Sequence, residues 1–84
     1  MNGRLRKAIL QAVAALGANK TICPSEVARA ASSGGEAWRE LMPKVRAEAH
    51  RLQADGLIDV TQKGKPVDPL SAKGPIRLGL PRKS

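Results

Sequence analysis

The stretch "WRELMPKVRAEAHRLQADGLIDV", residues 38–60, decides the fold because its hydrophobic period changes partway along. Its first part repeats apolar residues at the i, i+3, i+4, i+7 spacing of an amphipathic helix. The spacing predicts a helix from about Glu36 to Asp55. The apolar positions are Trp38, Leu41, Met42, Val45, Ala49 and Leu52. Pro43 falls on the outward side of this helix, where it costs a backbone hydrogen bond without disturbing the core face.

Gly56 marks the point where the helical period ends. A glycine directly after a helix suits a Schellman motif, and Leu57 supplies its usual hydrophobic partner. Beyond Leu57 the period becomes two, because Ile58 and Val60 alternate with the polar residues 59 and 61. This alternation predicts a strand with one buried face.

Upstream of residue 38 the sequence predicts two more helices. The first runs from Arg4 to Leu16, and Gly17 is placed to stop it. The second opens in "CPSEVARAA", residues 23–31, with Pro24 at the first helical position. The short segment 19–23 between them favours a strand. Residues 33 and 36, Ser and Glu, have the spacing of a capping box ahead of the third helix.

Downstream, "IRLGL", residues 76–80, alternates like a second strand, and residues 63–75 form a turn-rich loop between the two strands. The order of elements predicts an α+β fold of winged helix-turn-helix type, with three helices and a small antiparallel β-hairpin as the wing. We expect one domain over residues 1–84, with a frayed tail at about 81–84.

Four segments carry a resemblance to a known family: "TICPSEVARA", "WRELMPKVRAEAHRLQADGLIDV", "KGKPVDP" and "KGPIRL". Together they resemble a small bacterial family known as domain of unknown function 3253. The resemblance covers nearly the whole chain and departs mainly at "ASSGGEA", residues 31–37, which is richer in glycine. It implies a fold similar in outline to winged-helix proteins, and it implies no activity or ligand.

The charge balance points to a polyanionic partner. Fifteen Lys and Arg against seven Asp and Glu leave a net charge of +8, and the pI is near 10.6. Such an excess in a small domain is typical of nucleic-acid binders, although charge that serves only solubility is the alternative. The excess lies in residues 1–20 and 57–84, each with a net charge of +4, whereas residues 36–56 are neutral. Binding through this excess would therefore be mostly backbone contact.

A helical wheel of the third helix gives two polar flanks around a crest of Glu40, Pro43, Ala47 and Ala54. Arg39, Arg46 and His50 share one flank, and Lys44, Glu48 and Arg51 share the other. We expect double-stranded nucleic acid, with DNA as the expected form, to meet the basic residues of this helix, the wing and the first helix. The candidate contacts are Arg46, Arg39, Lys44, His50, Arg51, Lys63, Lys65, Lys73, Arg77, Arg4 and Arg6.

Some of these residues have structural alternatives. One of the three arginines 39, 46 and 77 is expected to anchor the wing through Asp68, which two prolines hold in place, while the others stay unpaired. Trp38, the chain's single aromatic residue, is expected to anchor the core, and Gly56 to end the helix. Because base stacking needs aromatic platforms, the scarcity of aromatic residues argues against single-strand binding.

Catalysis has no recognisable basis in the sequence, so we expect no enzyme activity, catalytic residue, cofactor, metal site or small-molecule substrate. Cys23 precedes a helix, where thiols can be reactive, but an inert small residue is the favoured interpretation. The N-terminal "MNGRLRK" and "AILQAVAALG" mimic an export signal, yet their helical spacing favours a structural helix. No stretch spans a membrane, and the lone cysteine suits the cytoplasm. The rival function is a module that docks an acidic protein.

Overall fold

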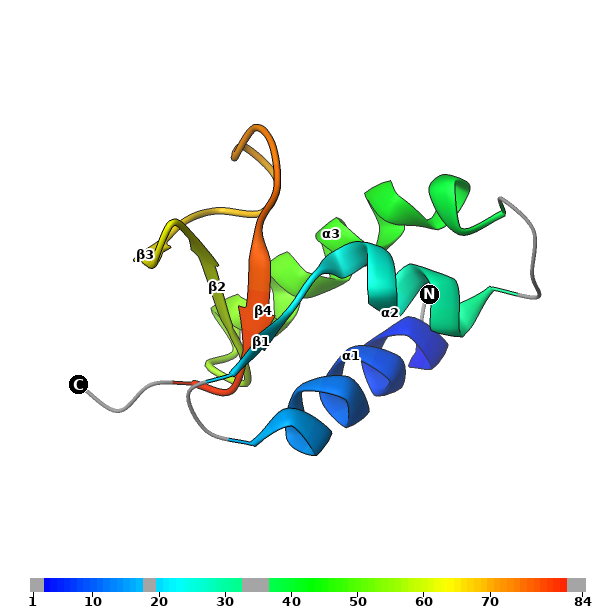
Figure 1. The fold of residues 1–84 in the computed structure, drawn as a ribbon, viewed down its shortest axis with the longest axis horizontal. Coiled ribbons are helices and arrows are strands. Elements are labelled where there is room, and N and C mark those ends of the chain that lie inside the picture. The colour runs from blue at the N-terminus through cyan, green and yellow to red at the C-terminus, as the bar shows by residue number, and fades with distance from the viewer. Residues whose placement is uncertain (1–2, 18–19, 33–36, 82–84) are drawn as a thin grey trace.

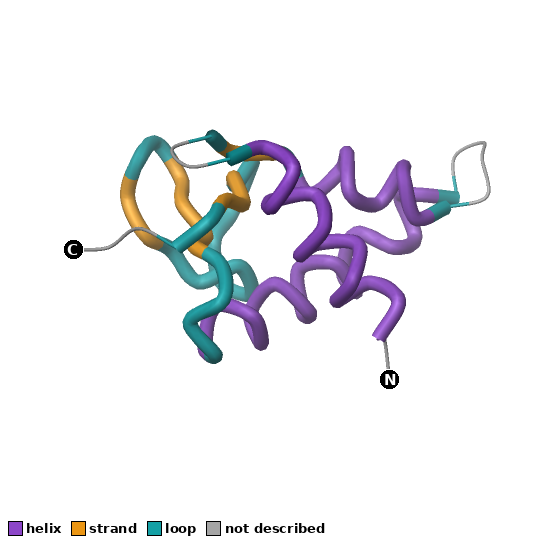
Figure 2. Tube along the Cα trace, turned by 90° about the horizontal axis from the view of Figure 1, so that it is seen from below, coloured by secondary structure: helices purple, strands orange, loops and turns teal. Residues whose placement is uncertain are grey.

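The computed structural model describes residues 3–17, 20–32 and 37–81. In it the three helices gather at one end and the strands at the other (Figures 1 and 2). The helices are α1 (Gly3–Leu16), α2 (Pro24–Ala31) and α3 (Trp38–Ala54). The strands are β1 (Thr21–Ile22), β2 (Asp59–Gln62), β3 (Lys65–Pro66) and β4 (Arg77–Gly79). The described elements therefore form the predicted α+β fold, which is compatible with a winged-helix-like arrangement.

The helix boundaries follow the local signals in the sequence. Pro24 occupies the first turn of α2, where a missing N–H costs nothing. Gly17, just past α1, has a φ of 85°, which favours glycine. The predicted start of α3 at Glu36, its capping box with Ser33 and residues 82–84 of the predicted tail at 81–84 lie outside the described residues.

The end of α3 is the predicted Schellman motif. Gly56 has a φ of 76°, and its N–H donates to the carbonyl of Gln53 at 3.0 Å. The N–H of Leu57 reaches back to the carbonyl of Leu52 at 2.9 Å. These two bonds are the pair that defines the motif, and they turn the chain from α3 directly into β2.

The sheet is antiparallel throughout, with the strand order β1-β4-β2-β3. Leu78 of β4 pairs with Ile22 of β1 on one side and with Val60 of β2 on the other. Leu78 and Val60 are fully buried, so this row faces the helices. The alternation predicted for β2 fails at Thr61, which is buried as well.

The prediction of a loop over 63–75 missed β3, which pairs with β2 across a tight turn. Lys63 and Gly64 form this turn, and both have positive φ, 52° and 81°. Positive φ at both central residues is the requirement of a type I′ hairpin turn. Asparagine or aspartate before glycine is the usual sequence there, and this chain has lysine, which explains the miss.

The core lies between the helices and the sheet. α1 contributes Leu5, Ile9 and Val13, and α3 contributes Val45, Ala49 and Leu52. Trp38 does not belong to this fully buried set but packs against its edge, so its predicted role as a core anchor is corrected. Its amphipathic indole suits such a half-buried position.

Glu48 is a second correction, because the wheel placed it on a solvated flank and its exposure is only 5 %. Since α1 covers that side of α3, Arg6 of α1 lies within 3.6 Å of the Glu48 carboxylate. A buried carboxylate needs such a partner.

Candidate nucleic-acid interface

Arg46 fixes the path of the β3–β4 loop, defined as residues 67–76. Its Nη1 donates to the carbonyls of Pro69 and Ala72 at 3.2 and 3.0 Å. Its Nη2 donates to the carbonyl of Gly74 at 2.7 Å. A planar guanidinium can bridge several carbonyls in this way. Arg46 is thus a structural residue that binds the wing side of the molecule through backbone carbonyls, not through Asp68 as predicted.

His50 and Gln53 continue this contact along the same stripe of α3. Gln53 Nε2 donates to the carbonyl of Val67 at 2.7 Å. His50 Nδ1 lies 3.2 Å from Asp68 Oδ1, which forms an ion pair when the imidazole is protonated. The predicted partner of Asp68, an arginine, is therefore replaced by His50, whose side chain stays 42 % exposed.

The pKa of the Asp68 carboxyl is lowered from its ordinary value of 3.8. The chief cause is the backbone N–H of Leu70, which donates to Asp68 Oδ1 at 2.9 Å. Desolvation raises the pKa to a lesser degree, and the charge of His50 lowers it further. The carboxylate therefore stabilises the turn at Leu70 when it is ionised.

Arg77 is engaged as well. Its Nε donates to Thr21 Oγ1 at 2.9 Å, its Nη2 to the Thr21 carbonyl at 3.1 Å, and its Nη1 to Cys23 Sγ at 2.7 Å. These bonds connect β4 to β1 and to the start of α2. The expectation that only one of the arginines 39, 46 and 77 is structural is therefore wrong, because two of them bind the fold internally.

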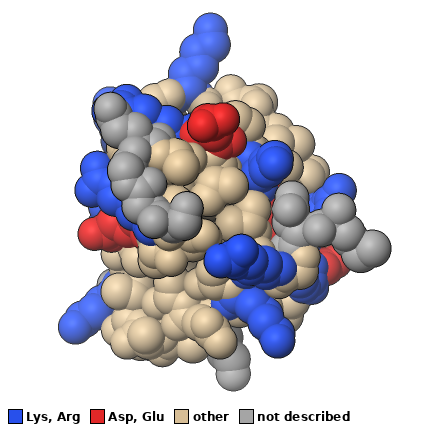
Figure 3. Space-filling model, turned by 90° about the vertical axis from the view of Figure 1, so that its right-hand side faces the viewer, with Lys and Arg blue, Asp and Glu red and all other residues tan. Residues whose placement is uncertain are grey.

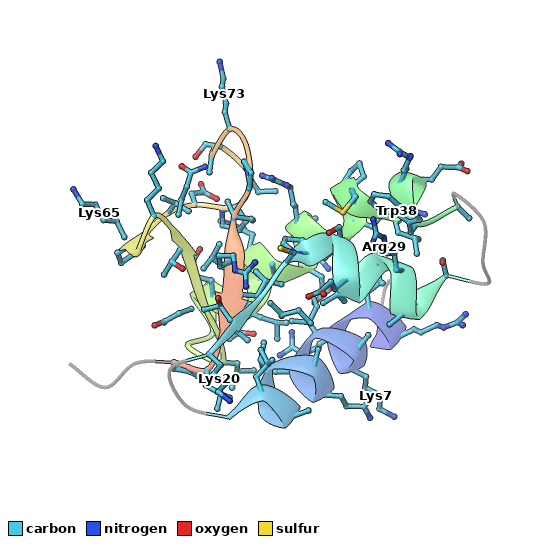
Figure 4. All side chains as sticks on the ribbon, viewed as in Figure 1. Lys7, Lys20, Arg29, Trp38, Lys65 and Lys73 are labelled. Atoms are coloured by element: carbon cyan, nitrogen blue, oxygen red, sulfur yellow. The ribbon has the colours of Figure 1, made fainter. Side chains whose placement is uncertain are left out.

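The remaining arginine, Arg39, lies against Trp38. Its guanidinium carbon is 4.9 Å from the ring centroid, and that of Arg29 is 4.6 Å from the same centroid. Distances below 6 Å are typical of cation–π contacts. Figure 4 shows Arg29 beside Trp38 where α2 meets the beginning of α3. Sequence reasoning overlooked Arg29, for which no local signal exists.

Arg6 and Arg51 are also paired, around the buried Glu48. Arg6 Nη2 lies 3.2 Å from Asp55 Oδ2, in addition to the Glu48 contact. Arg51 Nη1 lies 3.8 Å from Glu48 Oε1 and stays exposed. Arg6 thus connects α1 to the end of α3, which leaves it less suited to a nucleic-acid contact than its sequence position indicated.

Among the described residues, most of the cations that have no partner within the fold are lysines. Within this part of the chain, Lys63, Lys65 and Lys73 are exposed and have neither an ion pair nor a side-chain hydrogen bond. The same holds for Arg4, Lys7, Lys20 and Lys44. Lys65 and Lys73 project from the sheet end of the molecule, away from its body (Figure 4). We call residues 63, 65 and 73 the wing lysines.

The backbone beneath Lys73 is fixed from two sides. Gln62 Nε2 on β2 donates to the carbonyls of Lys73 and Pro75 at 2.6 and 3.1 Å. Arg46 holds the neighbouring Ala72 and Gly74 carbonyls from α3. Lys73 is therefore an unpaired side chain on a loop whose backbone is held by hydrogen bonds, so binding through it costs little backbone entropy.

The crest of α3 is exposed at Glu40, Pro43 and Ala54, as predicted, and half-buried at Ala47. Lys44 and Arg51 are exposed on one flank, although α1 buries Glu48 between them. On the other flank the β3–β4 loop contacts Arg46 and His50. Figure 3 shows basic side chains at several separate places on the face that contains the right-hand end of Figure 1. Among the described residues drawn in this view, the basic side chains form no continuous stripe.

Two further observations bear on other kinds of site. Within the described residues, no helix combines the length and the apolar character needed to cross a bilayer. In the same residues, no cluster of three or more His, Cys, Asp or Glu side chains is arranged to hold a metal ion.

Comparison with known proteins supports the resemblance noted in the sequence. A search of curated proteins finds no match. The family described as "Protein of unknown function (DUF3253)" matches residues 2–81. This range includes the wing lysines and all the residues that the structure describes. The chain therefore belongs to the DUF3253 family.

Proposed function

We propose that this protein is a winged-helix domain that binds double-stranded nucleic acid, with DNA as the expected form, through the phosphate backbone. The observation that carries the proposal is the set of three unpaired wing lysines on an ordered hairpin and loop. Phosphate contacts by lysine need no base edge, so binding of this kind is salt-dependent and weakly selective for sequence.

The proposal assigns α3 a secondary role. Its Arg46 and His50 are engaged with the β3–β4 loop, and Glu40 on its crest would repel phosphate. Lys44 and Arg51 remain as the α3 side chains that can reach a backbone phosphate. We therefore expect little discrimination between duplex sequences from this helix.

Charge reversal at matched positions tests the proposal. The full chain is titrated against several unrelated duplexes at low salt, as the wild type, as Lys65→Glu/Lys73→Glu and as Lys7→Glu/Lys20→Glu. Both double variants lower the net charge equally, and all four side chains are exposed. The control pair lies at the opposite side of the molecule from the wing (Figure 4).

We expect the wing variant to bind every duplex more weakly by about tenfold or more. Each lysine–phosphate contact releases counterions from the duplex, and this favourable contribution is lost with the contact. The control variant should bind within a factor of a few of the wild type. Equal weakening by the two variants would mean that only the net charge matters, and absence of wild-type binding at low salt would eliminate the proposal.

A further inference from the structure

An apolar groove runs along α3 beside the β3–β4 loop, and we call it the Met42 groove. It consists of two adjoining hollows of about 340–360 Å³ that share Met42 and Arg46 in their lining. Pro69 and Leu70 wall the first hollow. Trp38 and Pro75 are among the residues that wall the second. Each hollow is near the lower limit for a ligand site, which fits one or two side chains of a peptide.

The walls of the Met42 groove are preformed. Arg46 holds the carbonyls of Pro69 and Gly74, and the N–H of Leu70 is bound by Asp68. Leu70 is nevertheless 58 % exposed, the most exposed of the large hydrophobic side chains in the described residues. An exposed leucine on an ordered loop offers apolar contact area at small entropic cost, and Met42 can adapt to the shape of an occupant.

The rim of the groove is cationic. Arg77 contacts Cys23, which lines the second hollow, and Arg29 covers a face of Trp38. Arg46 and Arg77 each donate three hydrogen bonds within the fold. A guanidinium has five N–H donors, so both can also bind a carboxylate.

Two carboxylates lie near the groove and bear on its charge. Glu26 follows Ser25, a lining residue, and is exposed in the first turn of α2. Asp68 is already bound by the Leu70 N–H and by His50. The three arginines therefore leave the rim with a positive balance that favours an acidic occupant.

We propose that the Met42 groove binds a short acidic peptide segment of a partner protein. A bulky apolar side chain of that segment enters the groove between Met42 and Leu70, and flanking Asp or Glu side chains pair with the arginines of the rim. A duplex has no bulky apolar side chain to fill the groove, and a second copy of this chain, at +8, is repelled. The proposal rests on the groove and is independent of the wing lysines.

The probe is a phage library of short random peptides, selected on the immobilised full chain. Enriched peptides are then synthesised and titrated against the chain in solution, with the fluorescence of Trp38 as the signal. We expect the enriched sequences to combine one or two bulky apolar residues with several acidic ones.

A matched pair of leucine variants locates the binding. Leu70→Glu places a charge in the groove, whereas Leu57→Glu places the same charge at a leucine that is 41 % exposed after α3. Leu70→Ser gives the uncharged version, and far-UV circular dichroism checks that each variant is folded. We expect both Leu70 variants to weaken peptide binding about tenfold or more, since a buried leucine contact is lost. Leu57→Glu should retain it.

The proposal is overturned if no peptide is enriched, if the enriched peptides lack acidic residues, or if the Leu70 and Leu57 variants bind them equally. Leu70→Ser leaves all wing lysines in place, so its duplex affinity should equal that of the wild type. The peptide titration therefore tests the groove and the duplex titration tests the wing lysines, so that either proposal can be refuted while the other stands.

Discussion

Replacement of Arg46 by alanine should destabilise the protein although the side chain comes from the polar flank of α3. The change removes three hydrogen bonds to the β3–β4 loop, two of them part-buried and one exposed. It leaves the carbonyls of Pro69 and Ala72 without a donor. Pro69 is itself fully buried, so the loop cannot move out to water without exposing apolar surface.

The size of the effect follows from the two part-buried bonds. A net contribution of about 1 kcal/mol for each gives roughly 2 kcal/mol, because water replaces the exposed bond to Gly74 at little cost. For a domain of this length, 2 kcal/mol corresponds to a fall of about 10 °C in the melting temperature. Arg46→Lys should recover less than half, since one ammonium cannot bridge three separated carbonyls.

The assay is urea unfolding followed by the fluorescence of Trp38, with far-UV circular dichroism as a second probe. Arg51→Ala is the matched control, because Arg51 lies on the same helix and its guanidinium is exposed with one ion pair at 3.8 Å. We expect that control to change the free energy of unfolding by about 0.5 kcal/mol or less. If Arg46→Ala and Arg51→Ala have equal effects, the reasoning about the loop contact is refuted.

Three further predictions follow from single positions. Lys63→Asn should stabilise the fold by about 1 kcal/mol, because φ is 52° there and asparagine tolerates that region better; chemical denaturation measures it, and a destabilised variant would contradict it. Gly79→Ala should destabilise by about 1–3 kcal/mol, because a Cβ there would lie 2.8 Å from the Lys20 carbonyl oxygen; an unchanged melting temperature would show that β1 yields freely. Asp68→Asn should lose the stabilisation that the charged carboxylate gains from the Leu70 N–H. The pKa of Asp68 in the folded protein lies below 3.8, so this stabilisation is complete above pH 3.8 and is lost as the pH falls through the folded pKa. The difference in the free energy of unfolding between the wild type and Asp68→Asn should therefore become smaller in acid; a larger difference would contradict the prediction.

The helices and the two main strands could be predicted from the sequence because their signals are local. Pro24 at a first turn, Gly17 and Gly56 after helices, and the change from a helical to a two-residue period all act within a few residues. β3 escaped prediction because it is only two residues long and contains Pro66. Its edge position in the sheet explains why a proline is tolerated there.

The candidate site was predicted less well, because its contacts are long-range. A helical wheel groups Arg46 and His50 on one flank, as the structure has them, but the wheel cannot say what covers that flank. The partners of Arg46 are backbone carbonyls, which carry no sequence signature. Because a wheel also cannot show that another helix covers a flank, it placed Glu48 among the polar flank residues, although the packing of α1 buries Glu48.

The choice among the basic residues depended on the same tertiary information. Composition located the excess charge in the N-terminal and C-terminal parts of the chain, and the wing lysines are indeed exposed. It could not separate them from Arg6 and Arg77, whose partners lie 42 or more residues away along the chain. Only the fold distinguishes a cation that binds its own protein from one that can bind a phosphate.

The salt dependence of duplex binding tests the central claim most directly. The affinity of the wild type for one duplex is measured over a range of salt concentrations and compared with that of Lys63→Gln/Lys65→Gln/Lys73→Gln. Log affinity falls with log salt, and each phosphate contact adds about 0.9 to the steepness of this fall. The loss of three contacts should therefore make the slope less steep by roughly 2.7 in this variant. Lys7→Gln/Lys20→Gln should leave the slope unchanged. An unaltered slope in the wing variant would contradict the account.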